Sequence, residues 1–138
     1  MSVEIKTLEQ QEKMRIAGKL ASEVLDMIGE HVKPGVSTME LDEICNDYIV
    51  NTQKTIPANV GYRGFPGTTC TSINHVVCHG IPSEKRLKNG DIVNIDVTVI
   101  KDGFHGDTSR MFIAGKTSNQ AKKLIDVTYE SRCEGIRA

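Results

Sequence analysis

Apolar and polar residues alternate along the segment that begins at Ile92, and this alternation predicts a β-strand with one buried face. Asp102 and Gly103 follow the strand and favour a two-residue type I′ turn. If they form that turn, Lys101 pairs with Phe104 and the chain returns as a second, antiparallel arm. The apolar side of the first arm consists of Val93, Ile95, Val97 and Val99, and its polar side consists of Asn94, Asp96 and Thr98.

Two aspartates fall on the polar face of this predicted hairpin. In the stated register Asp96 lies opposite Ser109 and Thr98 lies opposite Asp107, so the aspartates are diagonal neighbours. Such positions are ~7–8 Å apart at Cα, which lets both carboxylates hold the same metal ion or a pair of metal ions. The alternative is an ordinary amphipathic hairpin with a solvated polar face. Asp is depleted in strands and two like charges on one face repel, which weakens this alternative but leaves it open.

Capping-box patterns predict the first two helices. Thr7 and Gln10 precede a helix over 8–32, in which apolar residues recur at helical spacing and after which a Pro-Gly pair ends the periodicity. Ser37 and Glu40 open a second, shorter helix in the same way. The apolar positions that define these helices are Met14, Ala17, Leu20, Ala21, Val24, Leu25 and Ile28 in the first, and Leu41, Ile44, Cys45, Tyr48 and Ile49 in the second.

The rest of the chain reads as loops, a further strand and a third helix. The segment 53–68 is rich in glycine and proline and predicts a loop, and 70–78 predicts a strand or hairpin. Ser118 can cap a third helix, which has no stop signal before Ala138. We therefore expect residues 1–138 to form a single domain that is truncated within a C-terminal helix.

Composition and charge narrow the function classes. The net charge of -1, with charged residues at 25%, is typical of a soluble globular protein and gives no reason to expect DNA binding. No run approaches the ~18 apolar residues of a membrane span, and no secretory signal is visible at the N-terminus. The four cysteines show neither a Cys-x-x-Cys pair nor the spacing of a disulfide framework. We interpret the chain as cytoplasmic, with reduced thiols.

A zinc site is a competing interpretation for one segment. His75, Cys78 and His79 lie close together in the sequence, with Cys70 upstream. A structural zinc site usually needs a second pair of ligands at a defined distance, and none is evident. We therefore favour Cys78 as a small buried apolar residue.

Taken together, these motifs resemble the N-terminal half of type I methionine aminopeptidases. The likeness runs through essentially all 138 residues. It is carried by the hairpin segments 94–97 and 102–109, by Val-Cys-His-Gly-Ile-Pro at 77–82, by 32–38, and by 41–49.

The resemblance implies a fold and a reaction. The fold would be α+β: half of a pita-bread fold, an antiparallel sheet with helices packed on one face. The activity would be removal of the initiator methionine from new polypeptides at a site with two divalent ions, reported as cobalt, manganese, iron or zinc. Asp96 matches the aspartate that chelates one metal, and Asp107 matches the aspartate that bridges both.

Further site residues follow from the same resemblance. His79 matches a catalytic histidine that contacts the substrate without binding metal. Asn74 and the carbonyl of Val76 match part of a monovalent-cation site. The residues that match the methionine side-chain pocket are Tyr62, Phe65, Cys70 and Asn59.

Two departures from the family pattern matter. The family's site also needs a histidine and two glutamates from its C-terminal half, and this chain stops before them. Asn59 stands where bacterial members commonly have a cysteine, and Arg63 where they often have a histidine, which puts methionine selectivity in question. A buried, unpaired amide would cost ~1–3 kcal/mol, so we expect the Asn59 amide to be hydrogen-bonded or solvated.

Three functions remain open at this point. The first is a metallo-aminopeptidase that acts on the N-terminal methionine of nascent peptides at the ribosome, with this chain supplying half of the site. The second is a catalytically inactive fragment that works as a binding or oligomerising module, and the third, weaker one is an aminopeptidase of the same fold that acts before proline. Because an isolated half would expose apolar surface, we expect a homodimer or association with the missing C-terminal half.

Overall fold

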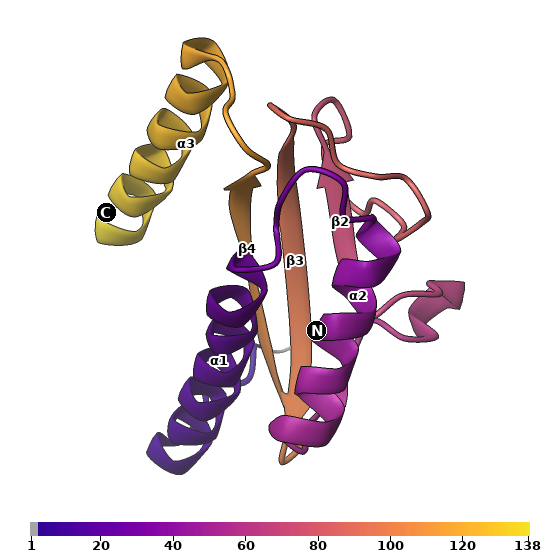
Figure 1. The fold of residues 1–138 in the computed structure, drawn as a ribbon. Helices are drawn as coiled ribbons and strands as arrows, with labels where there is room; N and C mark the ends of the chain where they lie inside the picture. The colour runs from indigo at the N-terminus through magenta and orange to yellow at the C-terminus, as the bar shows by residue number, and fades with distance from the viewer. Residues whose placement is uncertain (1–2) are drawn as a thin grey trace.

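The computed structural model describes residues 3–138 as four strands, three α-helices and two short helical turns (Figure 1). In chain order these are α1 (Leu8–Gly29), α2 (Thr38–Asp47), the π-helical turn Tyr48–Thr52, β1 (Ile56–Pro57), the 3₁₀ turn Tyr62–Gly64, β2 (Thr69–Ile73), β3 (Ile92–Lys101), β4 (Phe104–Ile113) and α3 (Asn119–Arg137).

All four strands belong to one antiparallel sheet, with β3 at its centre. β4 runs along one edge of β3 over its full length, whereas β2 and the two-residue β1 share the other edge. The predicted hairpin register is confirmed, because Lys101 pairs with Phe104 and Asp96 with Ser109. Asp102 and Gly103 both have positive φ, 51° and 81°, as a type I′ turn requires.

The predicted caps are also present. Thr7 and Gln10 close a reciprocal capping box at the start of α1, and Ser37 and Glu40 do the same for α2. The end of the first helix was predicted wrongly, since α1 stops at Gly29 and not at residue 32. Hydrogen bonds from the next backbone N–H groups to carbonyls only two or three residues back tighten the chain into a turn there.

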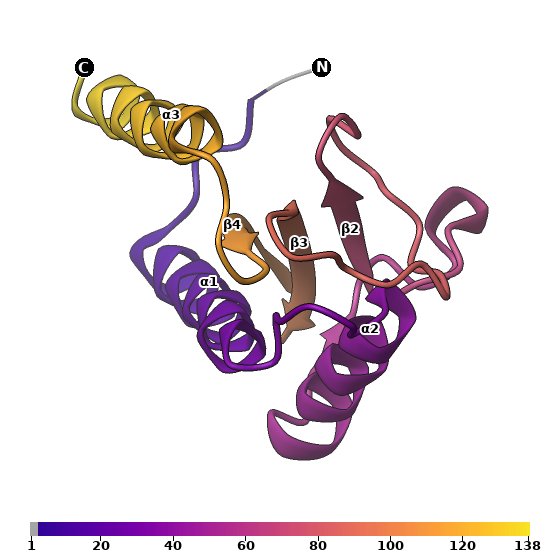
Figure 2. The same ribbon diagram turned by 45° about the horizontal axis from the view of Figure 1, so that its top comes forward.

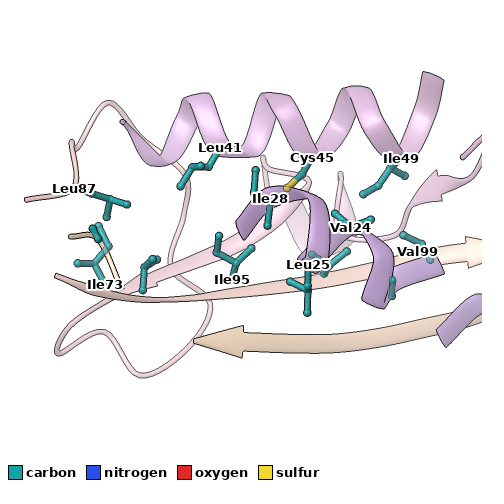
Figure 3. Packing of buried hydrophobic residues seen from close by; sticks show 14 residues of the cluster. Val24, Leu25, Ile28, Leu41, Cys45, Ile49, Ile73, Leu87, Ile95 and Val99 are labelled. Atoms are coloured by element: carbon teal, nitrogen blue, oxygen red, sulfur yellow. The ribbon is translucent and has the colours of Figure 1, made fainter. Parts of the chain in front are cut away.

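The hydrophobic core lies between the sheet and the first two helices, which cover the same face (Figure 2). α1 contributes Val24, Leu25 and Ile28, and the alternate residues of β3 meet them from below (Figure 3). α1 also approaches β4 closely at Gly106, where an added Cβ would sit 2.0 Å from the carbonyl oxygen of Ala17. A glycine is therefore required at this crossing. An antiparallel sheet with helices packed on one face is the predicted fold, and it is confirmed.

The opposite face of the sheet and the third helix are not covered. Asn94, Asp96 and Thr98 keep partial exposure on that face, and Asp107 is exposed. None of the residues of α3 is buried, and in both ribbon views the helix stands away from the sheet (Figures 1 and 2). α3 contributes four exposed apolar side chains, Leu124, Val127, Tyr129 and Ile136, whereas Asn94, Asp96, Thr98 and Asp107 make the open sheet face polar. None of the helices within residues 3–138 combines the length and hydropathy needed to cross a membrane.

Candidate metal centre and substrate pocket

Asp96 and Asp107 meet on the open face of the hairpin, as their diagonal register requires. Their strands are fixed by the core beneath them, because the residues on either side of Asp96, Ile95 and Val97, are fully buried against the helices. Gly106 fixes the neighbouring position on β4 through its contact with α1. The two carboxylates therefore sit on a packed framework, and a ligand that binds them finds them already in position.

The electrostatics of this pair suit a cation. Burial raises the pKa of Asp96 above its usual range, and the carboxylate of Asp107 raises this pKa further by charge repulsion and hydrogen bonding. His79 opposes the shift, because a positive charge there favours the ionised carboxylate. A divalent ion would relieve the repulsion, and carboxylate oxygens are the donors that manganese and similar hard ions prefer. The donor set that is present therefore fits a metal ion.

His79 is held at the mouth of the site by its neighbour Gly80. The Gly80 carbonyl accepts a hydrogen bond from the Thr71 N–H at 2.8 Å, and the Gly80 N–H donates to Ser72 Oγ at 3.1 Å. A Cβ on Gly80 would lie 2.1 Å from the Thr71 carbonyl oxygen, so only glycine allows this approach to β2. His79 itself has a φ of 55° and an exposed side chain. It is therefore presented to solvent at the site and does not belong to the core.

A cavity of about 520 Å³ joins these groups to the predicted substrate pocket. The two carboxylates and His79 line it together with aromatic and aliphatic side chains. The residues of the predicted site that line the cavity are Asp96, Asp107, His79, Tyr62, Phe65, Cys70 and Asn59. Residues from two loops and three strands are thus brought to one place, although they are spread from Asn59 to Asp107 along the chain.

The Asn59 amide is hydrogen-bonded, as expected. Its Nδ2 donates to the Thr68 carbonyl at 3.1 Å, and its backbone carbonyl accepts from the Tyr62 N–H at 3.0 Å. Asn59 therefore ties the loop that carries Tyr62 to the start of β2. Its side chain lines the cavity without leaving an unpaired donor there.

The segment predicted to bind a monovalent cation lies at the end of β2, outside the cavity. Asn74 adopts a φ of 52°, donates from Nδ2 to Asp91, and accepts from the Ile92 N–H. These bonds fix the orientation of its side chain, and the backbone carbonyl oxygens of the segment, including that of Val76, are further candidate ligands for a cation.

The prediction that Cys78 is a buried apolar residue was wrong. Cys78 is exposed, and all four cysteines are free thiols. In the loop from Asn74 to Gly80, the two end residues are hydrogen-bonded to Ile92 and to β2, and the Val76 N–H donates to the Ile73 carbonyl, whereas Cys78 makes no such contact with the sheet. Among residues 3–138 no group of three or more His, Cys, Asp or Glu side chains is placed to hold a metal ion.

Sequence reasoning missed four lining residues, Gly64, Pro66, Ile81 and Thr98, and Arg63, which it had named only as a departure from the family pattern, also lines the cavity. The alternation along β3 puts Thr98 on the face of Asp96, so its position was available from the pattern. Ile81 and Arg63 are in loops, Arg63 with a φ of 49°, and no local signal predicts where such residues point.

An antiparallel sheet that carries paired carboxylates beside a pocket agrees with the comparison to known families. Residues 12–138 match the model of metallopeptidase family M24, and the chain belongs to that family. Membership of a metallopeptidase family implies the use of divalent metal ions.

The similar proteins are methionine aminopeptidases. The chain is 64% identical to "Methionine aminopeptidase" of Escherichia coli K12 over 99% of its own length and 52% of the relative's. The crystal structure of methionine aminopeptidase from Rickettsia prowazekii matches with a TM-score of 0.96 at 56% identity, over 98% of this chain and 54% of that one. The Thermotoga maritima methionine aminopeptidase matches with a TM-score of 0.88 at 35% identity, over 94% and 52%. The chain thus spans about half the length of the relatives it matches, and its fold is half of theirs.

Proposed function

We propose that this chain supplies half of the active site of a methionine aminopeptidase. The observation that carries the proposal is that Asp96, Asp107 and His79 line a single cavity together with aromatic and apolar side chains. A metal-dependent aminopeptidase needs these three elements together: ligands for the ion, a proton donor beside it, and a pocket for the first side chain of the substrate. The similarity to methionine aminopeptidases supports the choice of substrate.

In this proposal Asp96 and Asp107 would hold two divalent ions, of cobalt, manganese, iron or zinc, and Asp107 would be the ligand that both share by the family resemblance. When bound, such a metal pair lowers the pKa of a shared water and polarises the scissile carbonyl. His79, exposed on its strained backbone, donates a hydrogen bond to the peptide or to the tetrahedral species as negative charge develops. The rigid framework under the hairpin keeps the carboxylates in place while this happens.

The apolar walls of the cavity take up the methionine side chain. Tyr62, Phe65 and Cys70 line the same cavity as the two carboxylates. Asn59 adds an amide to this wall, and its hydrogen bond to Thr68 orients it. We propose that Asn59 widens the range of accepted first residues toward polar ones. The carbonyls of Asn74 and Val76 hold a monovalent cation that stiffens the turn between β2 and His79.

A second candidate function rests on one observation. Within residues 3–138 the carboxylate pair has no third His, Cys, Asp or Glu arranged with it to complete a metal site. A module that binds a partner through its uncovered surface, without turnover of its own, is compatible with that. Both candidates predict little or no hydrolysis by this chain alone.

Reconstitution separates the two candidates. The chain is combined with the part of the E. coli methionine aminopeptidase that it does not match, and hydrolysis of a methionyl peptide is followed with manganese present. We expect activity from the pair and almost none from either part. His79→Ala should abolish most of it, whereas His75→Ala, a matched change at an exposed histidine of the same loop, should leave it intact.

Each outcome has a defined meaning. An inactive pair that forms a stable complex would favour the binding module, and brisk hydrolysis by the chain alone would contradict the half-site. Equal loss in the two histidine variants would remove His79 from the mechanism.

In the active pair, Asn59→Cys should narrow the preference toward methionine, and an unchanged profile would refute the role of Asn59. We further propose that the chain acts in the cytoplasm, on peptides that leave the ribosome.

A further inference from the structure

Asp42 is a buried carboxylate where α2 meets the start of β2, and it lies outside the residues that line the cavity. Its Oδ1 accepts hydrogen bonds from the Thr68 N–H at 3.0 Å, from the Thr69 N–H at 2.7 Å and from the Thr69 hydroxyl at 2.7 Å. Its Oδ2 shares the Thr68 N–H at 3.1 Å. One side chain of α2 thus holds two successive residues of the segment that enters β2.

The carboxylate of Asp42 has these donors in place of a cation. The ion pairs within residues 3–138 do not include it. A buried carboxylate is costly unless it is hydrogen-bonded, and an apolar side chain would join a helix to a strand at less cost. Hydrogen bonds have direction, however, so they fix the position and the rotation of the Thr68–Thr69 backbone. This feature favours a role in positioning over a role in packing alone.

Asn46 holds the same segment one turn further along α2. Its Oδ1 accepts a hydrogen bond from the Thr68 hydroxyl at 2.9 Å. Residues four apart lie on the same side of a helix, so Asp42 and Asn46 act on Thr68 together. α2 itself is fixed to the hydrophobic core by Leu41 and Cys45, which are fully buried. The segment is therefore attached to a rigid element.

Two residues of the cavity wall depend on the position of this segment. The Thr68 carbonyl accepts the hydrogen bond from Asn59 Nδ2 at 3.1 Å. Thr69 is followed directly by Cys70, which pairs with Asp96 in the register of β2 and β3. Both Asn59 and Cys70 line the cavity. A displacement of the Thr68–Thr69 backbone would therefore move an amide and a thiol of the cavity wall together.

We propose that Asp42 is a positioning residue that fixes the cavity wall formed by Asn59 and Cys70, and thereby sets how closely the cavity fits the first side chain of the substrate. The side chain that fits is unbranched and apolar. This consequence rests on the proposed function, whereas the positioning itself needs only contacts within residues 42–70.

The first test uses this chain alone and follows amide hydrogen exchange and side-chain amide signals by NMR. Asp42→Asn keeps the size of the side chain but replaces an acceptor oxygen with a donor group. We expect the Thr68 and Thr69 N–H groups to exchange roughly tenfold faster and the Asn59 side-chain signal to shift. Asp47→Asn, a matched change at an exposed carboxylate of the same helix, should have neither effect. An Asn59 signal that does not respond to Asp42→Asn would overturn the inference.

The second test uses the active pair of this chain with the unmatched part of the E. coli enzyme. Asp42→Asn should raise KM for a methionyl peptide roughly tenfold and leave kcat within about twofold, because the pocket wall moves while the metal ligands do not. The preference for a methionyl over a leucyl peptide should fall, since the two side chains differ in shape and not in polarity. Thr55→Val removes another buried hydroxyl, which donates to the Ile49 carbonyl at 3.3 Å. It should lower the melting temperature without changing KM.

Each outcome decides the inference. If Asp42→Asn does not fold, Thr69→Val takes its place, because it removes one donor and keeps the side-chain size; it should shift the Asn59 signal and raise KM about threefold. An unchanged KM, an equal rise in Thr55→Val, or a loss confined to kcat would each overturn the role of Asp42 in the pocket. A wild-type pair without activity contradicts the proposed function, and the Asn59 signal in the chain alone then decides whether Asp42 positions the wall.

Discussion

The two faces of the β3–β4 hairpin differ in burial and in charge, although their residues alternate along the same strands. On the covered face Val93, Ile95, Val97 and Val99 have no exposed surface. On the open face Asp96 is partly exposed and its pKa is raised, and Asp107 lies beside it. The covered face gains free energy from burial, whereas the open face holds two carboxylates that repel each other.

This difference shows how the fold tolerates a destabilising site. Because side chains alternate across a strand, changes on one face leave the packing of the other intact. The core side keeps Asp96 and Asp107 in place, and the open side is free to carry charge. The comparison therefore predicts that stability and metal binding respond to different residues of one hairpin.

The largest effect on stability should come from the covered face. Ile95→Ala opens a cavity between α1 and β3 and should lower the free energy of unfolding by ~2–5 kcal/mol. Thr98→Ala, on the open face of the same strand, should change it by less than about 0.5 kcal/mol. Urea unfolding of both variants measures this, and equal losses would break the comparison between the faces.

A smaller loss in the free energy of unfolding is expected from a substitution where α1 crosses β4. Gly106→Ala inserts a methyl group against the carbonyl of Ala17, so helix and strand must separate, at a cost of roughly 1–3 kcal/mol. Gly18→Ala is the matched control, since nothing lies within 4 Å of the added atom. It should stabilise α1 by about 1 kcal/mol, because alanine is the better helix former. A tolerated Gly106→Ala would show that the crossing is not close-packed.

On the open face a substitution should raise the free energy of unfolding instead of lowering it. With chelator present, Asp96→Asn removes a partly buried charge that Asp107 repels. It should raise the free energy of unfolding by less than about 1 kcal/mol and the melting temperature slightly. A raised pKa in the folded state means that the ionised group opposes folding, so the gain should appear as the pH rises above the ordinary range of a carboxyl and vanish in acid. A lowered melting temperature for Asp96→Asn would contradict the repulsion.

The sequence specified the local parts of this structure well. The hairpin register followed from alternation and an Asp-Gly turn, and the starts of all three helices followed from Thr7, Ser37 and Ser118, because these signals act within a few residues. The pairing of β2 with β3 and the exposure of Cys78 did not follow. Both depend on contacts made after the chain has folded, and Cys78 was assigned by residue type alone.

The candidate site likewise has residues that the local pattern predicts and residues that it does not. Asp96 and Asp107 could be placed together from the pattern, since their relation lies within one hairpin. The meeting of His79, Tyr62 and Cys70 with them was available only through the family resemblance, because three separate segments must converge. For α3 the local signal at Ser118 predicted the start of the helix but not its surroundings, and none of its residues is buried.

Calorimetric titration with manganese tests the central claim most directly, namely that the open face is a metal site. Two carboxylates leave most coordination positions to water, so the wild-type chain should bind weakly, with a measurable heat. Asp107→Asn should remove that heat, and Asp102→Asn, which deletes a charge at the turn of the same hairpin, should retain it. Equal heats from wild type and Asp107→Asn would contradict the account.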